Sequence, residues 1–133
     1  MKENLQIEPM PQPLVDPGEL TMIAEMEGWG FVAELVGLFE AQAQQRVAEI
    51  AIALGNGDLV TVHSHAHALK SSTGCLGAVR ASVLARQLEV APLDGALADH
   101  FACFHACLTD TQRALAMLLQ QQRVSAGPEG MSR

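Results

Sequence analysis

Apolar residues recur along this chain at steps of three and four, the spacing that places side chains on one face of an α-helix. Four long stretches carry the pattern, at about 30–54, 58–75, 78–91 and from residue 93 or 96 to residue 122. A shorter stretch, at about 17–26, precedes them. The pattern therefore predicts an all-α protein.

Residues that start or stop helices separate these stretches. Asp16 before Pro17 is a helix-start signal. Residues 55–57, Gly-Asn-Gly, end the long helix, and Asp58 is a good N-cap for the next one. Pro92 marks the break before the last helix. Because short connections join helices that run in opposite directions, we predict an antiparallel four-helix bundle with a short N-terminal covering helix.

The length of 133 residues suits one domain. We predict that the bundle spans residues 15–123. Three prolines between residues 9 and 13 favour a flexible N-terminal tail over residues 1–14. Residues 124–133 are predicted to form a flexible C-terminal tail.

Composition and charge narrow the possible functions. Hydrophobic residues make up 49% and aromatic residues 4%, which suits an aliphatic helical core. The net charge is −7 with only 8 Lys and Arg, so no nucleic-acid partner is expected. The N-terminus lacks the apolar segment of a signal peptide, and no stretch is apolar enough to cross a bilayer. We expect a cytoplasmic protein without direct membrane contact, whose cysteines Cys75, Cys103 and Cys107 are reduced core thiols.

The helix at 58–75 has two distinct faces. One face carries an imidazole, an ammonium and small groups at positions i, i+3, i+4 and i+7: His67, Lys70, Ser71 and Gly74. The other face is predicted to be buried: Leu59, Val62, Ala66, Leu69, Thr73 and Leu76. The helix is therefore expected to hold His67 towards water, where a partner protein can reach it.

A motif runs from this histidine into the following turn. It consists of histidine, any residue, an aliphatic residue and lysine, then small residues, an aliphatic residue and glycine: His67, Leu69, Lys70, Leu76 and Gly77. In this motif the chain resembles the histidine phosphotransfer (HPt) family of bacterial phosphorelays. The resemblance extends from about residue 16 to residue 122. One position departs from the pattern, because Ser71 stands where the family usually has glycine, so a small residue is kept.

The resemblance implies a phosphoryl carrier without kinase activity of its own. His67 would accept a phosphoryl group from a receiver-domain aspartate and pass it to another response regulator. The implied partners are receiver domains and a hybrid histidine kinase, and the chain would act as a monomer. It would need no cofactor of its own, because the receiver brings its aspartate and its Mg²⁺.

The helical spacing and the family resemblance together suggest roles for the residues around His67. Lys70, one turn away, would place an ammonium beside the phosphate charge. Residues on or near the same face are candidates for partner binding: His63, Ser64, Ser71 and Gly74. On the next helix, family members often place a polar residue that supports the histidine. Gln87 and Glu89 both lie in range, and the spacing does not choose between them.

The chemistry of the side chains agrees with this role. An imidazole nitrogen can attack an activated phosphoryl group and form a phosphoramidate. An exposed histidine is largely neutral at physiological pH, as a nucleophile must be. The chain has no Gly-rich loop of the P-loop or kinase type, so we do not expect it to transfer a phosphoryl group from a nucleotide.

Two other interpretations stay open at this point. An HPt-like adaptor could bind a receiver or kinase without carrying phosphate, and Ser71 at the usual glycine position keeps that hypothesis alive. His63 and His67, four residues apart, have a spacing that can bind a metal from one helix face. However, His65 points away from them and the face has no carboxylate or thiol, so no metal site is predicted.

Overall fold

The computed structural model describes the backbone of residues 13–132 and the side chains as far as residue 123. Within that range the chain forms five α-helices and no β-strand. The predicted all-α class is confirmed. Residues 1–12, most of the predicted N-terminal tail, lie outside the described residues.

The helices follow the predicted stretches: α2 (Pro17–Glu27), α3 (Trp29–Gly55), α4 (Leu59–Cys75), α5 (Val79–Val90) and α6 (Leu97–Ser132). The predicted caps are confirmed. Asp16 accepts a hydrogen bond from the Gly18 N–H at 3.0 Å, and Asp58 accepts one from the Thr61 N–H at 3.1 Å. The hydroxyl and then the N–H of Thr61 hold the pKa of the Asp58 carboxyl below its usual value, because both stabilise the carboxylate.

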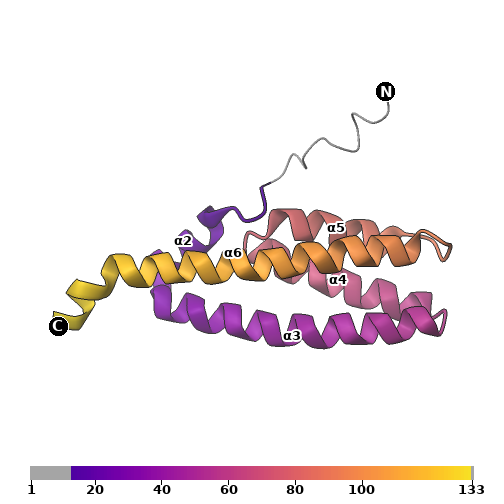
Figure 1. The fold of residues 1–133 in the computed structure, drawn as a ribbon, viewed down its shortest axis with the longest axis horizontal. Coiled ribbons are helices and arrows are strands. Elements are labelled where there is room, and N and C mark those ends of the chain that lie inside the picture. The colour runs from indigo at the N-terminus through magenta and orange to yellow at the C-terminus, as the bar shows by residue number, and fades with distance from the viewer. Residues whose placement is uncertain (1–12, 133) are drawn as a thin grey trace, which may run out of the picture.

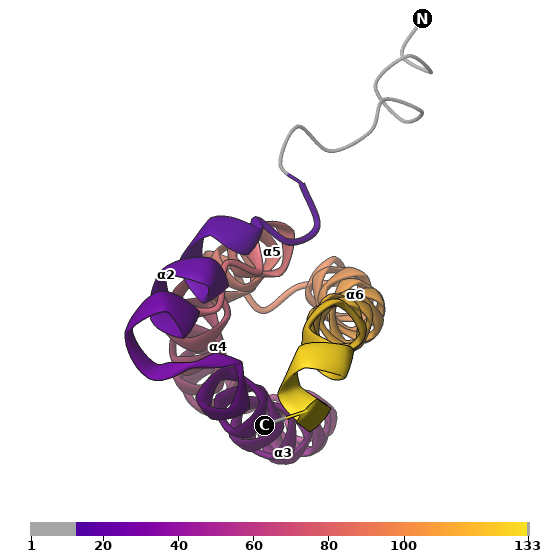
Figure 2. The same cartoon turned by 90° about the vertical axis from the view of Figure 1, so that its left-hand side faces the viewer.

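The four long helices run antiparallel, as Figure 1 shows. α4 packs between α3 and α5, and α6 completes the bundle against those same two helices (Figure 2). The short α2 packs against α3 and covers one end of the bundle. Because α4 has neighbours on two sides and the core behind it, one face of this helix remains turned outward.

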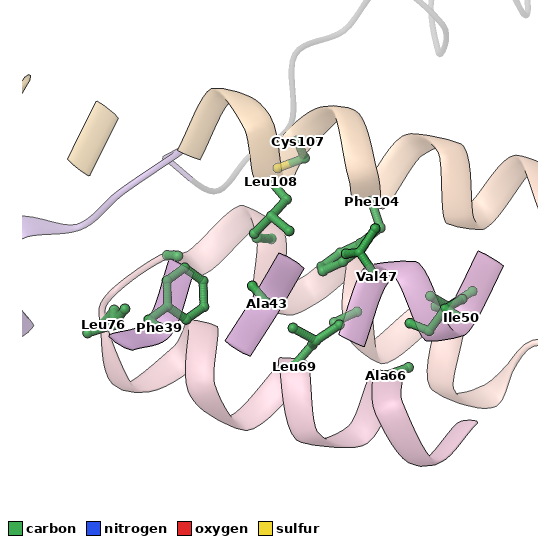
Figure 3. Packing of buried hydrophobic residues seen from close by; sticks show 14 of the residues in the cluster. Phe39, Ala43, Val47, Ile50, Ala66, Leu69, Leu76, Phe104, Cys107 and Leu108 are labelled. Atoms are coloured by element: carbon green, nitrogen blue, oxygen red, sulfur yellow. The ribbon is translucent and has the colours of Figure 1, made fainter. Parts of the chain in front are cut away.

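The core forms where the aliphatic stripes meet. α4 contributes the predicted residues Val62, Ala66, Leu69 and Thr73, all of them buried. Side chains of α3, α4 and α6 converge in Figure 3, with Phe104 and Leu69 near its centre. The buried hydroxyl of Thr73 donates to the Leu69 carbonyl at 2.7 Å, so this polar group is satisfied inside the helix.

A close backbone contact fixes the turn that follows α4. Gly77 has a φ of +76°, and its carbonyl accepts a hydrogen bond from the Asp16 N–H at 2.8 Å. A Cβ at this position would collide with the Asp16 carbonyl oxygen. The glycine of the motif therefore has a structural cause, since it lets the segment before α2 dock onto the end of the helix that carries His67.

The predicted end of the last helix and the predicted burial of two of the cysteines are wrong. The last helix does not end at Gln122 but continues to Ser132. Each residue added to an existing helix gains one backbone hydrogen bond, so a helix can extend beyond the end of its apolar stripe. Cys75 and Cys103 are exposed, and Cys107 is buried. The first two lie on outward sides of their helices, so they are not core thiols.

Candidate phosphoacceptor site

The outward face of α4 is a ridge of polar and small residues. Ser64, His67, Ser71 and Gly74 are exposed along it. The side chain of His67 is 62% exposed, which leaves the imidazole open to a partner. The two faces predicted for this helix are confirmed, with the aliphatic stripe inside and the imidazole outside.

The imidazole of His67 is held by a carboxylate on the neighbouring helix. Its Nδ1 lies 2.6 Å from Oε2 of Glu89 on α5. A carboxylate only accepts hydrogen bonds, so Nδ1 carries a proton and donates it. In the neutral ring the lone pair then lies on Nε2, which has no hydrogen-bond partner among the described residues. The exposed imidazole is thus fixed in one tautomer with its nucleophilic nitrogen unoccupied.

Lys70 binds the other oxygen of the same carboxylate. Its Nζ lies 3.0 Å from Oε1 of Glu89, whose side chain is 22% exposed. The Nδ1–H of His67 and then the Lys70 ammonium hold the pKa of the Glu89 carboxyl below its ordinary value, because both stabilise the ionised form. Glu89 therefore remains a carboxylate at neutral pH and ties the two motif residues together.

A further hydrogen bond holds α4 and α5 at close range beside the triad of His67, Lys70 and Glu89. The Ser82 hydroxyl of α5 donates to the Lys70 carbonyl at 3.1 Å. A Cβ on Gly74 would lie 3.5 Å from the Ser82 oxygen, an ordinary contact distance. Gly74 therefore lies at the α4–α5 seam as well as on the outward ridge. Ser82 received no role from the sequence, since a single serine on an amphipathic helix carries no signal of its own.

His63 also lies in the α4–α5 seam and is half-buried. Its Nε2 donates to the Ala91 carbonyl at 2.7 Å, at the point where α5 ends. This bond ties the first half of α4 to α5. The structure therefore gives His63 an internal contact, unlike Ser64 on the exposed ridge.

His65 lies on the opposite side of α4, against α3. A guanidinium nitrogen of Arg46 donates to its Nδ1 at 3.0 Å, and its Nε2 donates to Glu49 at 2.9 Å. Both ring nitrogens are occupied. No motif pointed to Arg46 and Glu49, although their spacing of three residues does place them on one side of α3.

The structure distinguishes the two candidates for support of His67. Glu89 forms the contact with the imidazole. Gln87, two residues earlier, is exposed and forms no hydrogen bond or ion pair with any residue that the structure describes. Two residues on a helix differ in direction by about 200°, so both cannot face α4.

Within the described part of the chain there is neither a metal-binding cluster of side chains nor a helix that could span a membrane. There, no three or more His, Cys, Asp and Glu side chains are grouped so that they could hold a metal ion. None of the helices in that range has the length and apolar character needed to cross a membrane.

The family model for the Hpt domain matches residues 34–125. The chain belongs to the Hpt domain family. Hpt domains are phosphocarriers of phosphorelays, not kinases, and they interact with receiver domains and kinases. The matched region contains α4, α5 and most of α3, and with them the triad of His67, Lys70 and Glu89. No curated protein and no solved structure matches the chain.

Proposed function

We propose that this Hpt domain carries a phosphoryl group on His67, which it accepts from a receiver-domain aspartate and passes to another response regulator. The proposal rests on the exposure and the hydrogen bonding of the His67 imidazole. His67 is exposed, its Nδ1–H is bonded to Glu89, and its Nε2 is unoccupied among the described residues. An exposed nucleophile with a fixed tautomer is what transfer between two proteins requires.

In the proposed step, the Nε2 lone pair attacks the phosphorus of an aspartyl phosphate on the receiver. The Nε2–P bond forms as the bond between phosphorus and the aspartate oxygen breaks, and the aspartate leaves as a carboxylate. The ring becomes cationic because Nδ1 keeps its proton. Glu89, 2.6 Å from Nδ1, stabilises that positive charge. Transfer to the next receiver reverses the step.

Lys70 has a second role in this proposal. In the unphosphorylated protein its ammonium binds Glu89 at 3.0 Å. Its flexible stem and its 30% exposed side chain support the proposal that it binds phosphoryl oxygens when they arrive beside the imidazole. Lys70 then stabilises the negative charge of the phosphoryl group, while Glu89 stabilises the positive charge of the ring.

The partner supplies the remaining chemistry. In this proposal the receiver, which in the donor step belongs to a hybrid histidine kinase, brings the aspartate, and Mg²⁺ bound there neutralises phosphoryl charge. The ridge of Ser64, Ser71 and Gly74 has small side chains on both sides of His67, which supports close approach of a receiver loop. The Hpt domain acts in the cytoplasm as a monomer and contributes no metal of its own.

Transfer from a phosphorylated receiver tests the proposal. The wild-type chain should gain an acid-labile, base-stable label that is absent from His67→Gln. His63→Gln and His65→Gln are matched controls on the same helix, and both should keep the label. Full labelling of His67→Gln would refute the assignment. Binding of the receiver by wild type without any transfer would instead show that the chain is an adaptor.

A further inference from the structure

The triad by itself provides no surplus of positive charge for a phosphoryl group. Neutral His67, the Glu89 carboxylate and the Lys70 ammonium sum to zero. A phosphoryl group on the imidazole adds negative charge close to the Glu89 carboxylate, and like charges at short distance repel. A second cation next to the triad would offset this repulsion.

Arg86 lies on α5 along the seam that faces α4. Four residues before it, Ser82 bonds the Lys70 carbonyl, and three residues after it, Glu89 bonds His67. Residues separated by three and four positions share a helix face, so Arg86 lies between two points where α5 contacts α4. Its side chain is exposed, on the outward side of the seam.

The guanidinium of Arg86 is not engaged elsewhere. It forms no hydrogen bond or ion pair with any described residue. By contrast, Arg46 bonds His65 and Arg113 pairs with Asp110. Arg86 is therefore a cation one turn from Glu89 that has no protein anion to hold it away from the site.

We propose that Arg86 binds the phosphoryl oxygens of phosphorylated His67, an inference that rests on the proposed transfer. Its planar fork of N–H donors suits a phosphoryl group, which it can contact with two parallel hydrogen bonds. Lys70 approaches from α4 and Arg86 from α5, so the phosphoryl group lies between two cations. Glu89 can then remain on Nδ1–H, where it is needed to stabilise the charged ring.

Arg86→Gln tests this assignment in the full chain, with Arg113→Gln as the matched control. Arg113 is an exposed arginine on α6, which lies across the bundle from α4, and its loss changes the net charge equally. Transfer from a phosphorylated receiver to Arg86→Gln should be about two- to fivefold slower at low salt, the effect of one exposed ion pair. The loss should shrink at high salt because screening weakens the contact. Arg86→Lys should recover part of the rate.

The phosphorus NMR signal of the labelled chain gives a second readout. A nearby guanidinium favours the fully ionised phosphoryl group, so its last ionisation should move to higher pH in Arg86→Gln and stay unchanged in Arg113→Gln. An unchanged titration in Arg86→Gln overturns the inference, even with slower transfer, because Arg86 would then act on the receiver. An equal loss in Arg113→Gln also overturns it. If the wild-type chain gains no label on His67, the proposed function fails first and this inference falls with it.

Discussion

Helix α4 has one edge against α3 and one edge against α5, and the same kinds of residue are arranged differently at the two edges. At the α3 edge, His65 bonds Glu49 and Arg46; at the α5 edge, His67 bonds Glu89, which in turn bonds Lys70. Each edge thus has one histidine, one glutamate and one cation. The difference lies in which group the cation binds.

At the α3 edge the cation binds the ring. Arg46 occupies Nδ1 and Glu49 occupies Nε2, so His65 has no nitrogen left and is only 17% exposed. At the α5 edge Lys70 binds the carboxylate and leaves Nε2 of His67 without a partner. One arrangement joins two helices, and the other presents a nucleophile. Residue type alone does not show which of the two histidines keeps a ring nitrogen without a partner among the described residues.

Replacing Glu89 and Glu49 one at a time should give the largest difference in transfer rate between the two edges. Glu89→Ala frees Nδ1 and the ring orientation, so transfer to His67 should slow on the order of a hundredfold, the cost of a misplaced reacting group. Glu49→Ala removes the equivalent bond at His65 and should leave transfer close to the wild-type rate. Single-turnover labelling by a phosphorylated receiver measures both. Similar losses in the two variants would show that both glutamates act only through the stability of α4.

The lysine should matter for transfer and little for stability. Lys70→Met keeps most of the apolar stem and removes the ammonium, so transfer should fall about tenfold, the size of one hydrogen bond to a charged group. The melting temperature should hardly change, because surface substitutions usually alter stability by no more than about 0.5 kcal/mol. A fall in melting temperature in step with the lost activity would assign Lys70 a structural role instead.

Arg46 should matter for folding stability and little for transfer, the reverse of Lys70. Arg46→Met removes the donor to His65 and should cost about 1 kcal/mol of folding stability, which thermal unfolding detects as a shift of several degrees. Transfer to His67 should stay near wild type once the variant is folded. A large loss of transfer in folded Arg46→Met would mean that the two edges of α4 are coupled.

The smallest expected effect is a change in the titration of Glu89. The pKa of this carboxyl lies below its ordinary value of 4.5 because His67 and then Lys70 stabilise the carboxylate. The stabilisation from these contacts is therefore fully present above pH 4.5 and is lost as the pH falls through the lowered pKa. In carbon NMR, His67→Ala should move the titration of Glu89 upward, and by more than Lys70→Met does. A larger shift in Lys70→Met would reverse the order of the two contacts.

The sequence was sufficient to predict the scaffold of the site. The three- and four-residue steps of apolar residues mark the buried face of α4 directly, and His67 lies opposite that face in any helix with that stripe. Asp58 defined the start of the helix because a capping carboxylate acts within one turn. These features depend on local geometry, which a sequence contains.

The choice between Gln87 and Glu89 depends on packing instead. The two residues flank the buried stripe of α5 on opposite sides, and the sequence does not say on which side α4 packs. The His65 contacts with Arg46 and Glu49 likewise depend on how α3 and α4 align across the bundle. Such contacts join residues far apart in the chain, so helical spacing alone cannot predict them.

The nitrogen of His67 that bears the phosphoryl group is the sharpest test of how Glu89 controls the imidazole. Because Glu89 holds Nδ1–H, we predict that a receiver-labelled chain carries phosphate on Nε2 of His67 and keeps the proton on Nδ1. Nitrogen–phosphorus correlation NMR on the ¹⁵N-labelled protein identifies the bonded nitrogen. Phosphate bonded to Nδ1 of His67, or to another histidine, would contradict the assignment of Nε2 as the acceptor.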